Sequence, residues 1–370
     1  MSENNLQRFN DAARSSLAAG ETVHQLIIRL LQHVGDCLSN LPPPRNIDLP
    51  EQFDLRPDND EATPQTSIYD FVKENVTLNE GRKRQMDTWF QKFIDCCNEQ
   101  SIEAQIFKHG SVMQGTAVVG SDLDISIRFE EGTQKGLADV LEMLKRKKDV
   151  LGLNGFIGIV GKACPTIKCS TTSAINIDIT DGGVRQLALC CGHFIREVLR
   201  QRTDAVVFIK ILKQVFMKSG NYGGSNQCPG GVAYSLLVFR AMQQLGVLPA
   251  FQRFDHGDFG VLNEMFDDYW NENAVFASTD YDITDEALTI RFSEILVWLI
   301  DTNLSIIFSL TDLEMQNPTD GIVIFSPPNN YQNVGSLVSP QTRLLWIIPE
   351  LKRLLKKWKE NPLECLESIV

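Results

Sequence analysis

The sequence lacks any uninterrupted apolar run long enough to cross a membrane. Its most hydrophobic stretch, IRFSEILVWLIDTNLSIIF, is broken by charged residues, whereas a membrane-spanning helix needs about 20 predominantly apolar residues in a row. The opening residues MSENNLQRFN also lack the apolar core of a secretory signal peptide. We therefore expect an intracellular protein without membrane contact, placed in the nucleus or the cytoplasm, with an organelle left open.

Cysteine and histidine spacings that would hold a metal are also missing. The nine cysteines include two adjacent pairs, Cys96–Cys97 and Cys190–Cys191, but no pair at zinc-ligand spacing, and the five histidines are scattered. Adjacent cysteines rarely bridge or chelate, so the pattern indicates free thiols in a reducing compartment.

An excess of positive charge is absent as well. The chain has 35 Lys and Arg against 47 Asp and Glu, a formal net charge of −12. Proteins that bind long nucleic acids tightly without a partner are usually basic, because contacts to phosphate supply most of the affinity. The charge argues against tight autonomous RNA binding, but it permits an enzyme that holds a few nucleotides or relies on a basic RNA-binding subunit.

The order of the predicted elements divides the 370 residues into four parts. Residues 1–66 combine a helix with a linker rich in proline and acidic residues, and residues 67–99 form a helical segment expected to belong with the central domain. Residues 100–200 alternate between strands and helices, whereas residues 201–370 are mainly helical. This segregation predicts an α+β protein with a small mixed β-sheet domain and a mainly helical domain.

The individual elements follow from periodicity. Apolar residues at helical spacing predict helices over 5–40, 79–99, 134–148, 186–200, 204–219, 231–246, 258–273, 287–300 and 340–360. Alternating residues predict strands over 103–108, 121–129, 156–160, 165–169 and 174–180.

Two of these strands carry aspartates on one face. In SDLDISIRF, Asp122 and Asp124 point away from the apolar residues, because strand side chains alternate. In AINIDIT, Asp178 has the same relation to its isoleucines, so a neighbouring strand can set it beside the first two. Three carboxylates this close repel one another, and Mg²⁺ (or Mn²⁺ as a substitute) would remove that repulsion. For Asp122 and Asp124 alone, a solvated strand face is an equally good interpretation.

A glycine-serine turn lies ahead of the first two aspartates. Gly110 and Ser111 follow a predicted strand and open a short helix, a geometry that offers backbone N–H groups and a hydroxyl to a triphosphate. The combination of this turn, an Asp-x-Asp strand and a third aspartate in a later strand is far more specific than any one of the three.

These motifs resemble a known superfamily. GSVMQGTAVVGSDLDI is similar to the signature of the DNA polymerase beta-like nucleotidyltransferases, and most of all to that of terminal poly(A) and poly(U) RNA polymerases. The resemblance extends from about residue 67 to about residue 355 and leaves the first 60 residues uncovered. Its other parts are CPTIKCSTTSAINIDIT, GGVRQLA, VVFIKILKQVFMKSGNYGG, GGVAYSLLVF and IFSPPNNYQNVGSLVS, the last over residues 324–339.

The resemblance implies a site and an activity. The nucleotide would lie in a cleft between the two domains, with Mg²⁺ on Asp122, Asp124 and Asp178 and the triphosphate on Gly110 and Ser111. It also implies phosphate contact by Lys213, base stacking by Tyr234 and base recognition in the loop 324–339, including Gln332 and Asn333. The implied reaction adds nucleotides from an NTP to the 3′ end of single-stranded RNA. From the residues alone, a lysine on an amphipathic helix or a tyrosine in an apolar helix is usually only a solvated charge or a core side chain.

Departures from the family pattern bear on which base is used. Met217 stands where many poly(U) enzymes have a second lysine, and Gln332 stands where they commonly have a histidine that excludes purines. Both favour AMP over UMP as the added unit. Ala233 replaces a common serine, and Ser326 replaces the usual aspartate of the loop, so one phosphate contact and part of base recognition are in doubt.

Two other functions remain open from the sequence. The GTAVVGSDLD segment is also similar to that of oligoadenylate and cyclic-nucleotide synthases, which join free NTPs without a primer. A non-catalytic adaptor with a degenerate transferase fold is the other alternative, although all three aspartates are present.

Overall fold

The computed structural model describes residues 67–130, 135–160, 165–181, 186–223, 228–249, 284–304, 307–309, 312–316, 323–325, 338 and 342–370. The predicted helices over 5–40 and 258–273, and the linker up to residue 66, lie outside the described residues. Contacts group Pro64–Val370 into one unit. None of the described helices is long and apolar enough to span a membrane.

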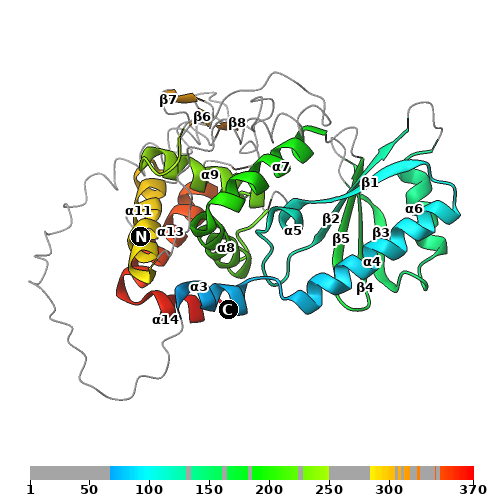
Figure 1. Cartoon of the computed structure of the whole chain (residues 1–370), viewed down its shortest axis with the longest axis horizontal. Coiled ribbons are helices and arrows are strands. Elements are labelled where there is room, and N and C mark those ends of the chain that lie inside the picture. Colours follow the sequence, from blue (N-terminus) through cyan, green and yellow to red (C-terminus); the bar gives the residue numbers. More distant parts are fainter. Residues whose placement is uncertain are drawn as a thin grey trace, which may run out of the picture. The chain divides into compact units, whose positions relative to one another are not determined.

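A five-stranded mixed sheet carries the predicted acidic strands (Figure 1). Its strands lie in the order β1-β2-β5-β4-β3. Only the β2–β5 pairing is parallel; the other three pairings are antiparallel. The strands are β1 (Ala104–His109), β2 (Leu123–Phe129), β3 (Leu153–Val160), β4 (Thr166–Thr171) and β5 (Asn176–Asp181).

One face of this sheet forms a hydrophobic core with two helices. α4 (Glu80–Glu99) and α6 (Leu137–Arg146) pack there, and the alternating isoleucines of β2 and β5 point toward them. α4 begins where the Asn79 side chain accepts a hydrogen bond from the Arg82 amide, which satisfies an otherwise orphaned donor. The opposite face of the sheet is therefore left to the polar residues of the same strands.

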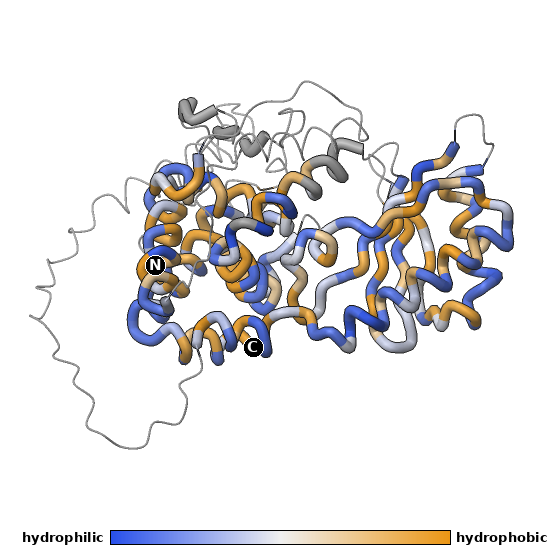
Figure 2. Tube along the Cα trace, in the orientation of Figure 1, coloured by the Kyte–Doolittle hydropathy of each residue, from blue (hydrophilic) through white to orange (hydrophobic). Residues whose placement is uncertain are grey.

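A second core is built almost entirely from helices. It contains buried residues from the two short helical segments α3 (Ile68–Phe71) and η1 (Val72–Val76), and from every longer helix after β5. In Figure 2 these helices show hydrophobic and hydrophilic stretches in alternation, as amphipathic packing requires. The later helical elements are α7 (Gln186–Gln201), α8 (Thr203–Lys218), α9 (Gly231–Gln244), α11 (Asp285–Asp301), η3 (Arg343–Ile347), α13 (Ile348–Glu360) and α14 (Pro362–Glu367).

The chain first passes from the helical core to the sheet core between η1 and α4, beside the turn at 117–119. Val76 and Leu78 exchange backbone hydrogen bonds with the turn at 117–119, and Thr77 forms a bridge with Val118. The Lys210 ammonium of α8 donates to the Thr77 hydroxyl at 2.9 Å. Burial lowers the pKa of Lys210 to about 8. Thr77 thus links α8 to the loop that leads into β2.

Most predicted elements are present within a few residues of the expected bounds, and the α+β class is confirmed. The grouping of two helices differs from the expectation. α4, placed with the central domain by its position in the chain, packs on the sheet, whereas α7, placed in the catalytic domain, packs in the helical core. Both differences arise because helix periodicity shows which face is buried but not which core receives it.

Three other features were not expected from the sequence. A small sheet of order β7-β6-β8 is formed by β6 (Ile307–Ser309), β7 (Asp312–Gln316) and β8 (Val323–Phe325). The predicted last helix begins with a π-helical segment, η3, and α14 follows it at the end of the chain. Strands of three residues carry too little alternation to be detected.

A buried ion-pair network joins α8 to α11. Asp204 is 1% exposed and accepts hydrogen bonds from Arg202 and Arg291, the closest at 2.6 and 2.7 Å. Arg202 also donates to the Val247 carbonyl. Burial alone would raise the pKa of Asp204, but the hydrogen bonds and charges of the two arginines outweigh it and lower the pKa.

We predict that Asp204→Asn lowers the free energy of unfolding by about 3–5 kcal/mol, because it leaves two arginines partly or wholly unpaired in the interior. The lowered pKa means that the ionised pair stabilises the fold above the usual carboxyl pKa of about 3.9 and is lost as pH falls below it. Urea unfolding at pH 7 and pH 3.5 should therefore show a smaller difference between wild type and variant at the lower pH. Asp149→Asn, an exposed control, should change stability by less than about 0.5 kcal/mol. Equal losses for both variants would contradict the assignment.

Candidate active site

The parallel pairing of β2 with β5 brings two aspartates together. In the register of the two strands, Asp124 lies opposite Asp178, and Leu123 and Ile125 lie opposite Ile177 and Ile179. The aliphatic pairs face the core, so the two carboxylates share the other face. Asp122 immediately precedes β2. The three predicted acids therefore lie at one place on the sheet.

The glycine-serine turn lies against this cluster from the β1 side. β1 ends at His109, which pairs with Asp124, and the short helix α5 (Gly110–Gln114) follows at once. Gly110 has φ +68°, and a Cβ on it would lie only 2.6 Å from Cγ of Asp124. No side chain caps the first turn of α5. Position 110 thus requires glycine for two reasons, backbone conformation and the space occupied by Asp124.

The close spacing of the three acids affects the pKa values of Asp122 and Asp124. Burial, followed by the charges of Asp178 and Asp122, raises the pKa of Asp124 to about 7. Burial also raises the pKa of Asp122, against a hydrogen bond from the Asn176 side chain that lowers it. These shifts mean that negative charge at this site is destabilised unless a cation compensates it.

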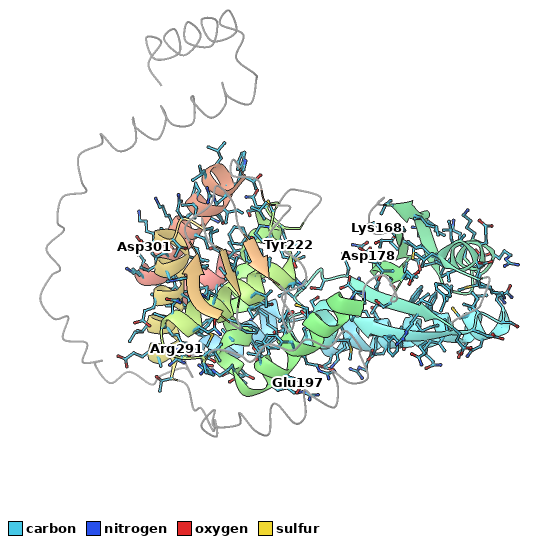
Figure 3. All side chains as sticks on the ribbon, turned by 90° about the horizontal axis from the view of Figure 1, so that it is seen from above. Lys168, Asp178, Glu197, Tyr222, Arg291 and Asp301 are labelled. Carbon is cyan, nitrogen blue, oxygen red and sulfur yellow. The ribbon has the colours of Figure 1, made fainter. Side chains whose placement is uncertain are left out.

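Two protein cations already approach the acids. Lys168 of β4 lies opposite Asp178 in the strand register and forms an ion pair with it, as the neighbouring labels in Figure 3 show. Lys213 of α8, which is 3% exposed, donates to the Ser121 hydroxyl at 2.8 Å. Burial lowers the pKa of Lys213 to about 8, although Asp124 and Asp122 oppose the shift. Lys213 is therefore close enough to Asp122 and Asp124 to interact with their charges. A lysine that contacts a metal-bound phosphate would need this position.

The donor chemistry of the site suits a hard divalent cation, because carboxylate oxygens are the ligands that Mg²⁺ prefers. Within the described part of the chain, however, no three His, Cys, Asp or Glu side chains are arranged so that they could enclose an ion. Asp178 is paired with Lys168, and Asp122 is hydrogen bonded to Asn176. A metal would thus have to take these oxygens from their present partners.

Tyr234 lies in the helical core and not at a surface. It is 2% exposed, and its ring is stacked between Phe216 at 4.9 Å and Tyr222 at 6.0 Å, measured between ring centroids. In this conformation both faces of Tyr234 are covered. Gln332 and Asn333, with the rest of residues 326–337, lie outside the described residues, so their base-recognition role stays a prediction.

Comparison with known proteins agrees with this geometry. Residues 90–170 match the family model described as a nucleotidyltransferase domain, a span that includes Gly110, Ser111, Asp122 and Asp124. A search of curated protein sequences gave no match.

Solved structures share the fold of the chain well beyond residues 90–170. A structure of the Cid1 poly(U) polymerase superimposes with a TM-score of 0.64 at 15% identity, covering 81% of this chain and 96% of that one. The GLD-2/RNP-8 complex gives 0.59 at 11% identity, with 81% and 96% covered. mtPAP in complex with GTP gives 0.58 at 12% identity, with 78% and 66% covered. These matches confirm that the chain has the nucleotidyltransferase fold that the sequence resemblance predicted.

Several residues near the candidate site were not identified from the sequence. Ser121 directly precedes Asp122, and its contact with Lys213 depends on the packing of α8. Lys168 was noted only as part of a motif, because its pairing with Asp178 depends on the strand order. Tyr222, in the glycine-rich segment after α8, belongs to no periodic pattern. Adjacency in the chain would have pointed to Ser121, whereas Tyr222 was noted only as part of a motif, because its stacking on Tyr234 depends on the tertiary structure.

We predict that Gly110→Ala destabilises this domain more than Gly115→Ala does. Both glycines have positive φ, but nothing lies within 4 Å of a Cβ at position 115, whereas Asp124 occupies that space at position 110. Gly115→Ala should cost about 1–2 kcal/mol for the left-handed backbone alone, and Gly110→Ala should cost clearly more.

A double-mutant cycle checks the cause of the difference. In an Asp124→Ala background, Gly110→Ala should cost less than it does in wild type, because the carboxyl group has been removed, but more than Gly115→Ala does, because the Cβ retained at position 124 lies 2.9 Å from a Cβ at position 110. Urea denaturation gives all the values needed. An unchanged cost of Gly110→Ala in the Asp124→Ala background would show that the backbone, and not the carboxylate, sets the requirement for glycine.

Proposed function

We propose that this protein is a template-independent terminal nucleotidyltransferase that transfers a nucleotide, with AMP favoured, from an NTP to the 3′ end of single-stranded RNA. The single observation that carries the proposal is the β2–β5 register, which sets Asp124 opposite Asp178 beside a glycine turn made for a triphosphate. Asp122, Asp124 and Asp178 would hold Mg²⁺ or Mn²⁺. Two such ions, when bound, supply activation of the attacking hydroxyl and stabilisation of the leaving pyrophosphate.

The residues of the chain have separate tasks in this reaction. Backbone N–H groups of the uncapped first turn of α5 and the Ser111 hydroxyl hold the triphosphate. Lys213 lies beside the acids and compensates phosphate charge, and its contact with Ser121 fixes its position. The side chains form no covalent bond with the substrate, so catalysis rests on positioning and electrostatic stabilisation.

The strand order also indicates from which side the RNA arrives. In phosphoryl transfer the attacking and leaving oxygens lie roughly in line through the phosphorus. The triphosphate turn is attached to β1, on one side of the strands β2 and β5 that carry the acids, whereas β4 lies on the other side. The RNA 3′ end would therefore approach over β5 and β4, where Lys168 can exchange its pairing with Asp178 for a primer phosphate.

The net charge of −12 sets a limit on RNA affinity. The 47 acidic residues outnumber the 35 basic ones and repel a phosphate backbone, so we infer weak, non-processive RNA binding by the chain alone. A basic RNA-binding subunit would compensate. GLD-2, one of the structural neighbours, has been solved as a complex with RNP-8.

We predict that Asp178→Asn abolishes nucleotide addition while preserving the fold. The substitution removes a charged metal ligand of the proposed site, and loss of one preorganised electrostatic group costs about 100- to 1,000-fold or more in rate. The measurement is extension of a short single-stranded RNA in Mg²⁺ with each NTP separately. Asp95→Asn, an exposed carboxylate of α4, should retain wild-type activity.

The same assay separates the alternative functions. Products formed from NTPs without RNA would favour a primer-independent synthase, and wild-type protein inactive with every NTP would favour a non-catalytic adaptor. Substantial extension by Asp178→Asn at wild-type thermal stability would reject the proposed metal ligand.

We predict that ATP is preferred over UTP and that Gln332→His shifts the ratio toward UTP. A glutamine offers both a donor and an acceptor and can turn to suit an adenine edge, and discrimination at one such contact amounts to about 1–3 kcal/mol. The measurement is kcat/KM for ATP and UTP on one RNA primer. A tenfold preference of the wild type for UTP would show that this interpretation of Gln332 is wrong.

A further inference from the structure

Lys168 holds one of the three aspartates from the neighbouring strand. It lies on β4 directly opposite Asp178 of β5, and the two side chains form an ion pair. Figure 3 shows both residues at the same place on the sheet. The Lys168 side chain is 49% exposed, whereas that of Asp178 is 21% exposed. The carboxylate is thus covered by a lysine whose own side chain remains half open to solvent.

Apart from Asp178, the strand positions next to Lys168 on this face hold neutral residues. Those on β4 and β5 are Thr166, Ser170, Asn176 and Thr180. On β3, the residue opposite Lys168 is Gly158, which has no side chain. Asp178 is therefore the only anionic partner that these strand positions offer, and the position beside Lys168 on β3 leaves room for a further ligand.

The other lysine of the site is held differently. Lys213 is 3% exposed and donates to the Ser121 hydroxyl at 2.8 Å, so burial and a hydrogen bond fix its position. Lys168 is half exposed, and its ammonium is a compact charge on a flexible stem that can reach a new partner. Of the two lysines, Lys168 is the one that can exchange its partner.

A metal ion and the Lys168 ammonium compete for the same carboxylate. A dication on Asp178 would stand close to a second positive charge, and the two would repel each other. The same ammonium acts on the other acids: burial raises the pKa values of Asp122 and Asp124, and the Lys168 charge is among the groups that oppose this rise. Metal binding therefore has to break the ion pair, and the released ammonium gains only water unless an anion is near.

An RNA phosphate would be such an anion. In the proposed reaction the primer approaches over β5 and β4, and Lys168 lies on β4. With the phosphate bound, Lys168 has a new partner and Asp178 is released for the metal; with the metal bound, Lys168 is released for the phosphate. Each ligand removes a cost that the other would meet, which is positive coupling, and such coupling is reciprocal.

We propose that the Lys168–Asp178 ion pair couples metal binding to RNA binding, because one ammonium is shared between a metal ligand and an RNA phosphate. This inference rests on the proposed function and adds a regulation of the same site. Without RNA, the pair keeps Asp178 occupied, so an NTP that arrives alone meets an incomplete metal site. The pair thereby favours addition to RNA over reactions of free NTPs.

The first measurement is Mn²⁺ binding to the full chain without NTP or RNA, followed by the electron paramagnetic resonance signal of free Mn²⁺. Lys168→Gln removes the competing ammonium and should tighten Mn²⁺ binding by about 5-fold or more, as coupling between two sites typically does. Lys168→Arg keeps the charge and should bind Mn²⁺ no more tightly than wild type. Lys108→Gln is the matched control, because this lysine of β1 is also ion paired, but with Asp87, and it should leave Mn²⁺ binding unchanged.

The second measurement adds a short single-stranded RNA whose last nucleotide is 3′-deoxy, so that no 3′-hydroxyl can coordinate the ion. Mn²⁺ bound by the RNA alone is measured separately and subtracted. The RNA should tighten Mn²⁺ binding to wild type by about 5- to 150-fold, equally for Lys108→Gln, and clearly less for Lys168→Gln. The effect of RNA on wild type is a test in itself, even if a variant does not fold.

Two results would overturn the coupling: Mn²⁺ binding by Lys168→Gln that is no tighter than that of wild type, or RNA that leaves Mn²⁺ binding to wild type unchanged. An equal effect of RNA on wild type and on Lys168→Gln would also count against it. Coupling as expected, in a protein that extends no RNA with any NTP, would reject the proposed transferase activity and leave the coupling standing. Normal extension without coupling would reject the coupling alone.

Discussion

Pairing of β2 with β5 is the interaction on which the rest of the site depends. It is the only parallel pairing in the sheet, and its register sets Asp124 directly opposite Asp178. A slip of either strand by one residue would turn the isoleucines of that strand out of the core and its acid into it. The burial of Ile125, Ile127, Ile177 and Ile179 therefore fixes the position of the acids, and the geometry of the acid cluster is a consequence of hydrophobic packing on the other face.

Crowding three carboxylates at this place costs stability, and the fold offsets the cost with cations drawn from different elements. Lys168 reaches Asp178 from the neighbouring strand β4, and Lys213 reaches the cluster from α8. A buried ammonium is itself unfavourable, as the lowered pKa of Lys213 shows. The two unfavourable charges compensate each other only because the helical part is held against the loop before β2, through Lys210, Thr77 and the 117–119 turn.

Glycine at position 110 shows how tightly the proposed triphosphate site and the acids are coupled. Asp124 fills the space that a larger residue would need, so the turn and the carboxylate cannot be changed independently. The stack of Phe216, Tyr234 and Tyr222 has the corresponding role on the helical side, because each ring sets the plane of the next. The candidate site therefore lies between two closely packed groups: the glycine turn against Asp124 on the sheet, and the ring stack in the helical core.

The sequence by itself determined the local features of this protein: its helices and strands, the face of β2 and β5 that carries the acids, and the glycine turn ahead of them. Periodicity and backbone chemistry are local properties, so they can be followed along the chain without knowledge of its neighbours. Only the tertiary structure decided that α4 covers the sheet, that Lys168 lies opposite Asp178, and that Tyr222 covers Tyr234. Those relations join residues between 10 and more than 40 positions apart, and they depend on strand order and on which core receives each apolar face, which no local pattern encodes.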